Sequence, residues 1–282
     1  MTDVANENID RYAVFGNPIA HSKSPLIHSL FAEQTAQKIS YTAVLVLPDK
    51  FNEAVSTFAK SGGKGINITV PFKIDAWNLA THLSERAKRA GAVNTLTINQ
   101  DGDYSADNTD GVGLIRDLTT NNMIDICGKS ILIIGAGGAV RGTLQPLLEQ
   151  QPKEIIIANR TKQTAINLAQ DFSDLGNIQG IGLDELDTIT TDIIINGTSA
   201  SLHGELPPLP NSLVGSSTFC YDMMYADEPT VFMQWGSDNG AAKVSDGLGM
   251  LVEQAAESFS IWRSVQPETK TVIQTIRNSL KK

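Results

Sequence analysis

The chain has 282 residues, of which 41% are hydrophobic, and this is enough to bury one large or two ordinary domains; we expect two. Its net charge of −9 argues against a nucleic acid as a partner, because proteins that attract polyanions usually carry a basic face. Two cysteines, Cys127 and Cys220, are too few for a disulfide framework or a metal-ligand cluster, so the sequence predicts structural thiols and no metal site.

The amino-terminal stretch, MTDVANENID, is polar and acidic, and it lacks the basic segment and apolar core of a secretory signal. No apolar run approaches the length of about 18 residues that a membrane span requires. These features predict a cytoplasmic protein without a membrane partner.

The segments that follow alternate between strand-like and helix-like patterns. The expected elements are a strand (11–16), a helix (Ser24 as N-cap, Pro25 at N1, to about Gln37), a strand (41–48), a helix (51–62) and a strand (64–70). Such alternation predicts a mostly parallel sheet. A helical region from about Asp75 to Arg89 comes next, and residues 92–108 are expected to form two short strands around the turn Asp101–Gly102.

The stretch NITVPFK, residues 67–73, ends the third of these strands. Its apolar residues alternate with Asn67 and Thr69, which predicts one buried face and one face with hydrogen-bonding side chains. Pro71 prevents the strand from continuing. Lys73 follows where a helix begins, so it is either an ordinary surface lysine or a cation that reaches into a cleft at the edge of the sheet.

A second alternating series begins at Lys129. Its expected elements are a strand and glycine turn leading into a helix (129–142), a strand (154–160), a helix (161–172), a strand (191–199) and a strand (218–225). The series predicts a second doubly wound unit that is complete by about Val244.

The chain ends with two expected helices. Apolar residues at helical spacing indicate an amphipathic helix: Leu248, Leu251, Val252, Ala255, Phe259 and Trp262. Another helix is expected from about Thr269, and no strand follows. This tail could pack back on the first domain, so we expect one discontinuous domain (1–110 and 247–282) and a second domain (111–246).

The segment GAGGAV, residues 135–140, lies between an apolar strand and a helix, as a dinucleotide-binding turn requires. Gly135 permits a tight turn, Gly137 lets the backbone approach a pyrophosphate, and the helix start supplies N–H groups. Val140 stands where a glycine or alanine usually allows close packing of the helix on the strand, so the match is loose there. An ordinary tight turn is the alternative.

The end of the next strand indicates which nucleotide binds. An NAD site usually has a carboxylate there, which accepts from the ribose hydroxyl. This chain has Asn159, Arg160 and Thr161 instead, and a guanidinium can pair with a 2′-phosphate. The triplet therefore favours NADP, although Arg160 could also be a surface residue at the start of the next helix.

Several stretches together resemble the shikimate dehydrogenase family, and the resemblance extends nearly from end to end. They are FGNPIAHSKSP (15–25), NITVPFK (67–73), GAVNT (91–95), DNTDG (107–111), GAGGA (135–139) with NRT (159–161), YDMMY (221–225) and DGLGMLVEQA (246–255). The resemblance implies an α/β fold with a mostly parallel substrate domain completed by the C-terminal helices, and a Rossmann-like NADP-binding domain. It also implies reduction of 3-dehydroshikimate to shikimate with NADPH, in aromatic amino-acid biosynthesis.

The resemblance also implies site residues. Ser22 and Ser24 match serines that bind the substrate carboxylate, and further substrate positions are Asn67, Thr69, Asn94, Tyr225 and Gln254. The implied cofactor positions are Gly135, Ala136, Gly137, Gly138, Ala139, Asn159, Arg160, Thr161, Met223 and Gly247, of which Met223 and Gly247 would line the nicotinamide.

Lys73 and Asp110 match the catalytic pair of the family. The reaction needs a group that gives a proton to oxygen while hydride arrives at carbon. The sequence leaves open which of the two carries that proton.

Two alternatives remain. One is a quinate/shikimate relative that also uses NAD, and the other is a non-catalytic NADP and metabolite sensor on the same scaffold. The NRT triplet and the two serines argue against the first, and retention of both Lys73 and Asp110 argues against the second. The oligomeric state, a homodimer included, is left open.

Overall fold

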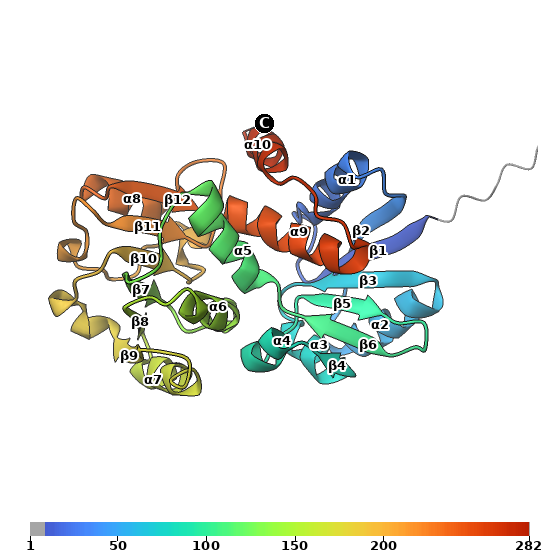
Figure 1. The fold of residues 1–282 in the computed structure, drawn as a ribbon, viewed down its shortest axis with the longest axis horizontal. Helices are drawn as coiled ribbons and strands as arrows, with labels where there is room; N and C mark the ends of the chain where they lie inside the picture. The colour runs from blue at the N-terminus through green and yellow to red at the C-terminus, as the bar shows by residue number, and fades with distance from the viewer. Residues whose placement is uncertain (1–8, 282) are drawn as a thin grey trace, which may run out of the picture. The chain divides into compact units, whose positions relative to one another are not determined.

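The structure is a computed structural model that describes residues 9–281 (Figure 1). The polar amino-terminal residues 1–8 lie outside the described part. The chain divides into two compact units: unit 1 comprises 9–109 and Ala255–Val272, and unit 2 comprises Asp110–Gln254 and 273–281.

Unit 1 is built on a six-stranded sheet of order β2-β1-β3-β5-β6-β4. Its strands are β1 (Asp10–Gly16), β2 (Ile39–Leu45), β3 (Gly63–Ile68), β4 (His82–Leu83), β5 (Thr95–Ile98) and β6 (Tyr104–Asp107). The pairings β1–β2, β1–β3 and β4–β6 are parallel, whereas β3–β5 and β5–β6 are antiparallel. The sheet is therefore mostly parallel, and β5 and β6 form the expected hairpin.

One face of this sheet is covered by α2 (Phe51–Lys60), α3 (Lys73–Leu79) and α4 (Glu85–Ala90). The expected single helical region from Asp75 to Arg89 is wrong, because α3 and α4 are separated by β4. Ala80 is extended, and the N–H groups of Thr81 and Ser84 donate to Tyr104 O and Ala106 O, which places the intervening chain at the edge of the sheet. Ser84 then caps α4 by accepting from the Ala87 N–H at 3.1 Å.

The opposite face carries α1 (Ser24–Gln34) and part of α9 (Leu248–Arg263). Two details of α1 differ from the expectation. Its N-cap is Lys23 and not Ser24, so the Ser24 hydroxyl is not used as a cap. The helix also ends at Gln34 and not near Gln37, because Ala36 adopts a φ of 52°, which a continuing helix does not allow.

An aromatic cluster fills the space between α1, β2 and α9. The His28 ring is fully buried and stacks on Tyr41, with ring centroids 4.1 Å apart. Phe31, Phe259 and Trp262 surround it. Neither ring nitrogen of His28 has a partner with hydrogen-bond geometry among the described residues. Burial lowers its pKa to about 3, and the nearby Asn67 side chain offsets part of this effect. His28 is therefore neutral at physiological pH.

Unit 2 is built on a six-stranded sheet of order β12-β11-β10-β7-β8-β9, and every pairing is parallel. The strands are β7 (Ser130–Ile134), β8 (Glu154–Asn159), β9 (Ile178–Gly182), β10 (Ile193–Asn196), β11 (Phe219–Asp222) and β12 (Lys243–Asp246). This is the doubly wound order of dinucleotide-binding domains. The sequence pattern missed the two edge strands, β9 and β12, because an edge strand is only partly buried and its apolar pattern is weak.

The helices of unit 2 cover both faces of this sheet. One face is covered by α5 (Asp110–Arg116), α6 (Gly138–Glu149) and α7 (Lys162–Asp171), whose apolar residues pack against the strand residues on that face. The other face is covered by α8 (Val231–Asp238), which packs against the strand residues that alternate with them. The alternation follows from the period of two along each strand. Both faces are apolar, as a parallel sheet requires.

The tail contributes to both units. Residues 255–272 belong to unit 1, whereas 247–254 and 273–281, which include most of α10 (Lys270–Leu280), belong to unit 2. The boundaries thus differ from the expected assignment of 247–282 to one domain. Asp117 accepts from the Met250 N–H at 3.0 Å, and Arg277 Nη1 donates to Asp246 Oδ2 at 2.6 Å, so both parts are bonded to unit 2.

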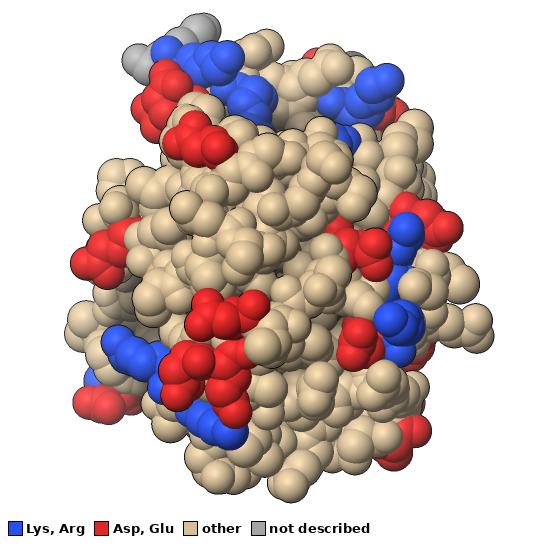
Figure 2. Space-filling model, turned by 90° about the vertical axis from the view of Figure 1, so that its left-hand side faces the viewer, with Lys and Arg blue, Asp and Glu red and all other residues tan. Residues whose placement is uncertain are grey.

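Other features of the described residues can be stated briefly. None of the helices within 9–281 combines the length and apolarity that a membrane crossing needs, and no group of three acidic, histidine or cysteine side chains there could hold a metal ion. Cys127 is exposed and Cys220 buried, both as free thiols. The face drawn in Figure 2 carries acidic and basic side chains interspersed among uncharged ones.

The neutral, buried state of His28 predicts a pH-dependent stability. Its pKa is about 3 in the folded chain against 6.5 ordinarily, so the unfolded chain binds the proton more readily between these values. The contribution of neutral His28 to the free energy of unfolding is complete above about pH 6.5 and is lost as the pH falls toward 3. Between about pH 7 and pH 5 the loss should be about 2 kcal/mol.

His28→Phe keeps a flat ring against Tyr41 but cannot be protonated. Between pH 7 and pH 5, the free energy of unfolding in urea should therefore decrease less in this variant than in the parent, by about 2 kcal/mol. His203 is exposed, and His203→Gln should retain the parent's pH dependence. Equal pH dependence in the parent and His28→Phe would contradict the prediction.

Candidate active site

The glycine turn of unit 2 connects β7 to α6. Gly135 has a φ of 104°, which favours glycine, and its N–H donates to Ala158 O at 2.8 Å. Gly137 is the N-cap of α6 and provides no side-chain cap. A Cβ built on Gly137 or on Gly138 would meet no atom within 4 Å. The turn therefore leaves open space at a helix N-terminus, which fits a pyrophosphate.

Val140, which departs from the usual dinucleotide pattern, is fully buried. Its Cγ2 occupies the position that a side chain on Gly197 would need, so a Cβ there would collide with it. Gly197 directly follows β10 and its N–H donates to Ile134 O at 2.8 Å. The small residue that close packing requires thus directly follows β10 and is not on α6. Gly197 is not among the residues predicted from the sequence, because its only signal there is a glycine after an apolar strand.

The residues predicted to bind the ribose 2′-phosphate, Asn159, Arg160 and Thr161, lie at the end of β8. Asn159 Nδ2 donates to Thr161 O at 3.0 Å, which holds the three residues in a tight turn. Arg160 is exposed, and it makes no hydrogen bond or ion pair with residues 9–281. The next cation, Lys162, is paired with Glu185 at 2.6 Å. Arg160 is therefore available to an external anion.

Met223 and Gly247 lie together just beyond β11 and β12. The Gly247 N–H donates to Met224 O at 3.1 Å, and a Cβ on Gly247 would collide with the carbonyl of Met223. Together with Gly135, Asn159 and Gly197, these residues all lie at or just beyond the carboxyl ends of parallel strands. Ligands of doubly wound sheets bind at that edge.

Tyr225 follows β11 by three residues and is partly buried. Burial raises the pKa of its hydroxyl, and the nearby Asp246 carboxylate raises it further. Asp246 is 5% exposed and its charge is compensated by Arg277. The phenol therefore stays protonated and can donate a hydrogen bond.

The predicted carboxylate-binding serines lie at the start of α1. The Ser24 N–H donates to Ser22 Oγ at 3.3 Å, so the two residues form a compact turn. Ser24 is 9% exposed. Thr69 is bonded to the end of β1: its N–H donates to Phe15 O at 3.0 Å, and its methyl group packs where Gly16 lacks a side chain.

Asn67 is placed differently from the expectation that it faces the substrate. It is 7% exposed, its Nδ2 donates to Asn94 O (3.1 Å) and Ser258 Oγ (3.0 Å), and its Oδ1 accepts from Tyr41 (2.7 Å). The face of β3 that carries Asn67 is covered by α9, which the sequence pattern did not indicate. The Asn67 side chain is thus bonded to the interior of unit 1.

Asn94 and Thr109 connect the two predicted catalytic residues to the sheet. Lys73 is the first residue of α3, is partly buried, and its carbonyl accepts from the Val93 N–H at 2.9 Å. Asn94 follows Val93, and its Oδ1 accepts from the Thr109 N–H at 2.9 Å. Asp110 follows Thr109, begins α5 and is 7% exposed.

Gln254 is partly buried on α9 within unit 2, where its Nε2 donates to Leu251 O at 2.8 Å.

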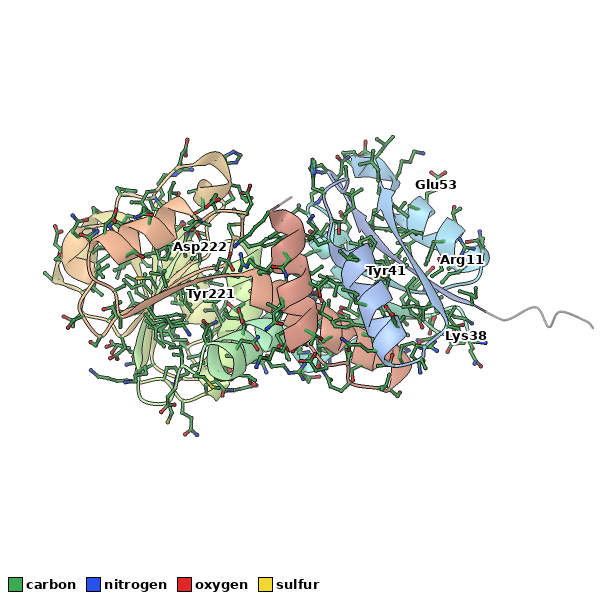
Figure 3. All side chains as sticks on the ribbon, turned by 90° about the horizontal axis from the view of Figure 1, so that it is seen from above. Arg11, Lys38, Tyr41, Glu53, Tyr221 and Asp222 are labelled. Carbon is green, nitrogen blue, oxygen red and sulfur yellow. The ribbon has the colours of Figure 1, made fainter. Side chains whose placement is uncertain are left out.

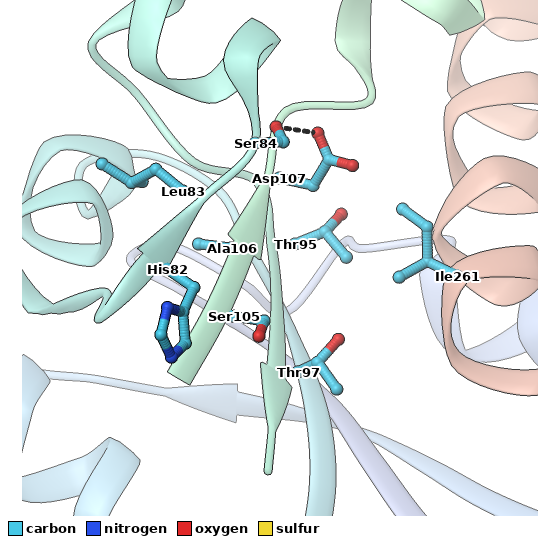
Figure 4. A pocket seen from close by; sticks show the side chains of 9 residues that line it. All are labelled: His82, Leu83, Ser84, Thr95, Thr97, Ser105, Ala106, Asp107 and Ile261. Atoms are coloured by element: carbon cyan, nitrogen blue, oxygen red, sulfur yellow. Dashed lines mark hydrogen bonds between the residues drawn. The ribbon is translucent and has the colours of Figure 1, made fainter. Parts of the chain in front are cut away.

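Unit 1 contains a pocket of about 250 Å³ (Figure 4), which none of the predicted residues lines. In it, Ser84 donates to Asp107 at 2.6 Å. The pocket is lined by His82, Leu83, Ser84, Thr95, Thr97, Ser105, Ala106, Asp107 and Ile261.

Comparisons with known families cover most of the chain. The shikimate dehydrogenase substrate binding domain matches residues 14–96, the shikimate / quinate 5-dehydrogenase family matches 117–203, and the shikimate 5'-dehydrogenase C-terminal domain matches 247–277.

Individual relatives agree with these matches. A protein of Cellvibrio japonicus named shikimate dehydrogenase (NADP(+)) is 55% identical over 271 residues, which are 96% of this chain and 98% of the relative. The crystal structure of an Ael1 enzyme from Pseudomonas putida is 44% identical, covers 97% of this chain and 98% of that one, and has a TM-score of 0.90. A Thermus thermophilus shikimate 5-dehydrogenase in complex with NADP(H) and shikimate is 28% identical, covers 96% and 100%, and has a TM-score of 0.86.

The contact between Val140 and Gly197 can be tested by substitution. Gly197→Ala should lower the free energy of unfolding by about 1–3 kcal/mol, because the added methyl group collides with a fully buried side chain. Combining it with Val140→Ala should cost less than the sum of the two single changes, as measured in urea. Additive effects would show that the two residues do not share this space.

Proposed function

This chain belongs to the shikimate dehydrogenase family, and on that premise we propose that it reduces 3-dehydroshikimate to shikimate, reversibly, with NADPH. The observation that carries the proposal is the match to relatives of this activity over nearly the whole chain. NADP is the cofactor, and when bound it supplies or accepts the hydride.

The proposed cofactor site is the carboxyl edge of the unit 2 sheet. Its turn, Gly135 to Ala139, would hold the pyrophosphate with the N–H groups at the start of α6. Arg160 would pair with the 2′-phosphate, with Asn159 and Thr161 beside it. Support comes from the exposure of Arg160 and from the absence of a partner for it within 9–281. Met223 and Gly247 would border the nicotinamide.

The proposed substrate-binding residues are the ones that the family resemblance implies. Ser22 and Ser24 would donate hydrogen bonds to the substrate carboxylate, and Thr69, Asn94, Tyr225 and Gln254 would contact its remaining oxygens. The proposed role of Asn67 changes, because its amide is bonded inside unit 1. It would act by supporting Asn94.

Lys73 and Asp110 are the proposed catalytic pair. A proton must reach the carbonyl oxygen as the carbon is reduced, and a lysine ammonium or a neighbouring carboxylic acid can supply it. Both residues begin helices. The Lys73 carbonyl accepts from the Val93 N–H, and Thr109, which precedes Asp110, donates to the adjacent Asn94. This shared anchoring supports a joint role.

The function is tested by mixing purified protein with shikimate or quinate and with NADP or NAD, and by following the absorbance of the reduced nicotinamide. Efficient turnover with shikimate and NADP is expected. Comparable rates with quinate or NAD would favour a relative of broader specificity, and no turnover in any mixture would favour a sensor.

Two further aspects are proposals of the same kind. The free thiols Cys127 and Cys220 suit a reducing compartment, which supports the cytoplasm as the location. Assembly as a homodimer stays a prediction, and the native mass in solution would test it.

Changing Arg160 should alter the choice of cofactor. In Arg160→Asp, the carboxylate repels a 2′-phosphate but can accept from a ribose hydroxyl, so the preference for NADP over NAD should fall or invert. The ratio of kcat/KM for the two cofactors measures it. Lys162→Ala is the matched control, because Lys162 is already paired with Glu185, and it should keep the parent's ratio. An unchanged ratio in Arg160→Asp would place the phosphate elsewhere.

Changing Lys73 should affect turnover more than binding. Lys73→Ala should lower kcat by about 100-fold to 10,000-fold, the usual scale for a lost general acid or base. Lys73→Arg keeps the charge, but its guanidinium does not readily release a proton, so it should be almost as inactive. Steady-state kinetics with both substrates varied separates the two parameters. Near-normal kcat in Lys73→Arg would assign proton transfer to Asp110 or to water.

A further inference from the structure

A chain of side-chain hydrogen bonds runs through unit 1 from β2 to the start of β5. Its inner members are nearly inaccessible: Asn67 is 7% exposed, Ser258 0%, Thr95 1% and Asn94 3%. Tyr41, labelled in Figure 3, is the partly buried outer member. Polar groups at this depth are nearly always hydrogen-bonded, because an unmade hydrogen bond there costs free energy.

The chemistry of each atom fixes the direction of the first hydrogen bonds. The amide oxygen of Asn67 can only accept, so it takes the Tyr41 hydroxyl proton over 2.7 Å. Asn67 Nδ2 can only donate, and Ser258 Oγ accepts from it at 3.0 Å. The short contact of Nδ2 to Asn94 O, 3.1 Å, supports this orientation of the amide.

The same reasoning continues to the other end. Thr95 Oγ1 donates to Asn94 Oδ1 over 2.9 Å, because an amide oxygen carries no proton. Thr95 Oγ1 also lies 2.7 Å from Ser258 Oγ. Since the Thr95 proton is directed to Asn94, Ser258 must donate to Thr95. The hydrogen bonds from Asn67 through Ser258 and Thr95 to Asn94 therefore run in one direction. The Thr109 hydroxyl lies beside them, 3.3 Å from Ser258 Oγ and 3.2 Å from Asn94 Oδ1.

This direction determines how the Asn94 amide is turned. Its oxygen accepts from Thr95 and also from the Thr109 N–H, at 2.9 Å in both cases. The oxygen edge of the amide is thereby directed to the interior of unit 1, and Nδ2, which donates to Thr109 Oγ1 at 2.9 Å, forms the other edge. Thr109 immediately precedes Asp110.

We propose that Ser258 and Thr95 are positioning residues that hold the Asn94 amide so that it donates, and does not accept, a hydrogen bond to an oxygen of the substrate. The inference rests on the proposed function, in which Asn94 binds the substrate. Loss of the Thr95 hydroxyl removes one of the two donors that hold the Asn94 oxygen inward and leaves only the Thr109 N–H, so the amide is held less firmly in the donating orientation.

Two substitutions at Thr95 provide the sharpest test. Thr95→Val has nearly the same shape but no hydroxyl, so it breaks the chain next to Asn94, whereas Thr95→Ser keeps the hydroxyl. The KM for shikimate should rise by about 5-fold to 20-fold in Thr95→Val and stay near the parent's in Thr95→Ser. The KM for NADP should not change in either variant. Ser258→Ala keeps the Thr95 hydroxyl next to Asn94, and Asn67 Nδ2, 3.3 Å from Thr95 Oγ1, can donate to it directly, so the KM for shikimate should rise less than in Thr95→Val.

Coupling and a matched control distinguish positioning from a general loss of stability. In an Asn94→Ala background, Thr95→Val should cause no further rise in the KM for shikimate, because Thr95 acts through Asn94. Thr191→Val makes the same change at a buried threonine of unit 2, whose hydroxyl donates to Ser130 O at 2.8 Å. It should lower the thermal midpoint and leave the KM for shikimate unchanged.

Each outcome decides the matter. A parent-like KM in folded Thr95→Val, equal impairment in Thr95→Ser, or an additive effect in the Asn94→Ala background would overturn the inference while the proposed function stands. If Thr95→Val does not fold, the same comparisons are made with Ser258→Ala. If the parent itself does not oxidise shikimate with NADP, the proposed function fails, and the inference fails with it.

Discussion

The arrangement of unit 2 depends on the hydrogen bonds that the buried carboxylate of Asp117 accepts. It is 2% exposed and accepts from the Tyr221 hydroxyl at 2.6 Å, the Met250 N–H at 3.0 Å and Asn121 Nδ2 at 3.0 Å. These donors come from β11, from the start of α9 and from the segment after α5. Burial raises the pKa of this carboxyl, and the hydrogen bonds offset part of that effect. One buried acceptor thus determines where the chain enters α9 (Figure 3 labels Tyr221).

The same helix has consequences in unit 1. It supplies Met250 to unit 2 and, two turns later, Ser258 to unit 1. Ser258 supports the Asn67 and Thr95 side chains, on which the orientation of Asn94 depends. A buried polar chain of this kind adds less stability than an apolar core would, but it specifies one arrangement, since any other leaves a donor or acceptor unsatisfied.

The proposed cofactor site in unit 2 depends on backbone space more than on side chains. Gly135 supplies a positive φ, Gly137 and Gly138 leave the helix start uncovered, and Gly197 accommodates Val140. The loose match at Val140 is therefore not a weakness of the site. Close packing of a helix on a sheet needs one small residue at the contact, and either partner can provide it. Arg160 would complete the proposed site, because it extends from the end of β8 with no partner in the described part of the chain.

The amino-acid sequence by itself determined the features that depend on neighbouring residues along the chain. These include the order of most strands and helices, the glycine turn at Gly135, the cation at Arg160 and the family to which the chain belongs. Hydrophobic period, turn chemistry and short motifs are local properties, so they can be read without a structure. The tertiary structure alone decided three other matters. It revealed the edge strands β9 and β12, the compensation of Val140 by Gly197, and the inward orientation of Asn67. In each case the partner is distant in the sequence: Asn67 donates to Ser258, 191 positions away. Contacts of this kind arise only when separate segments pack together, and no local pattern records them.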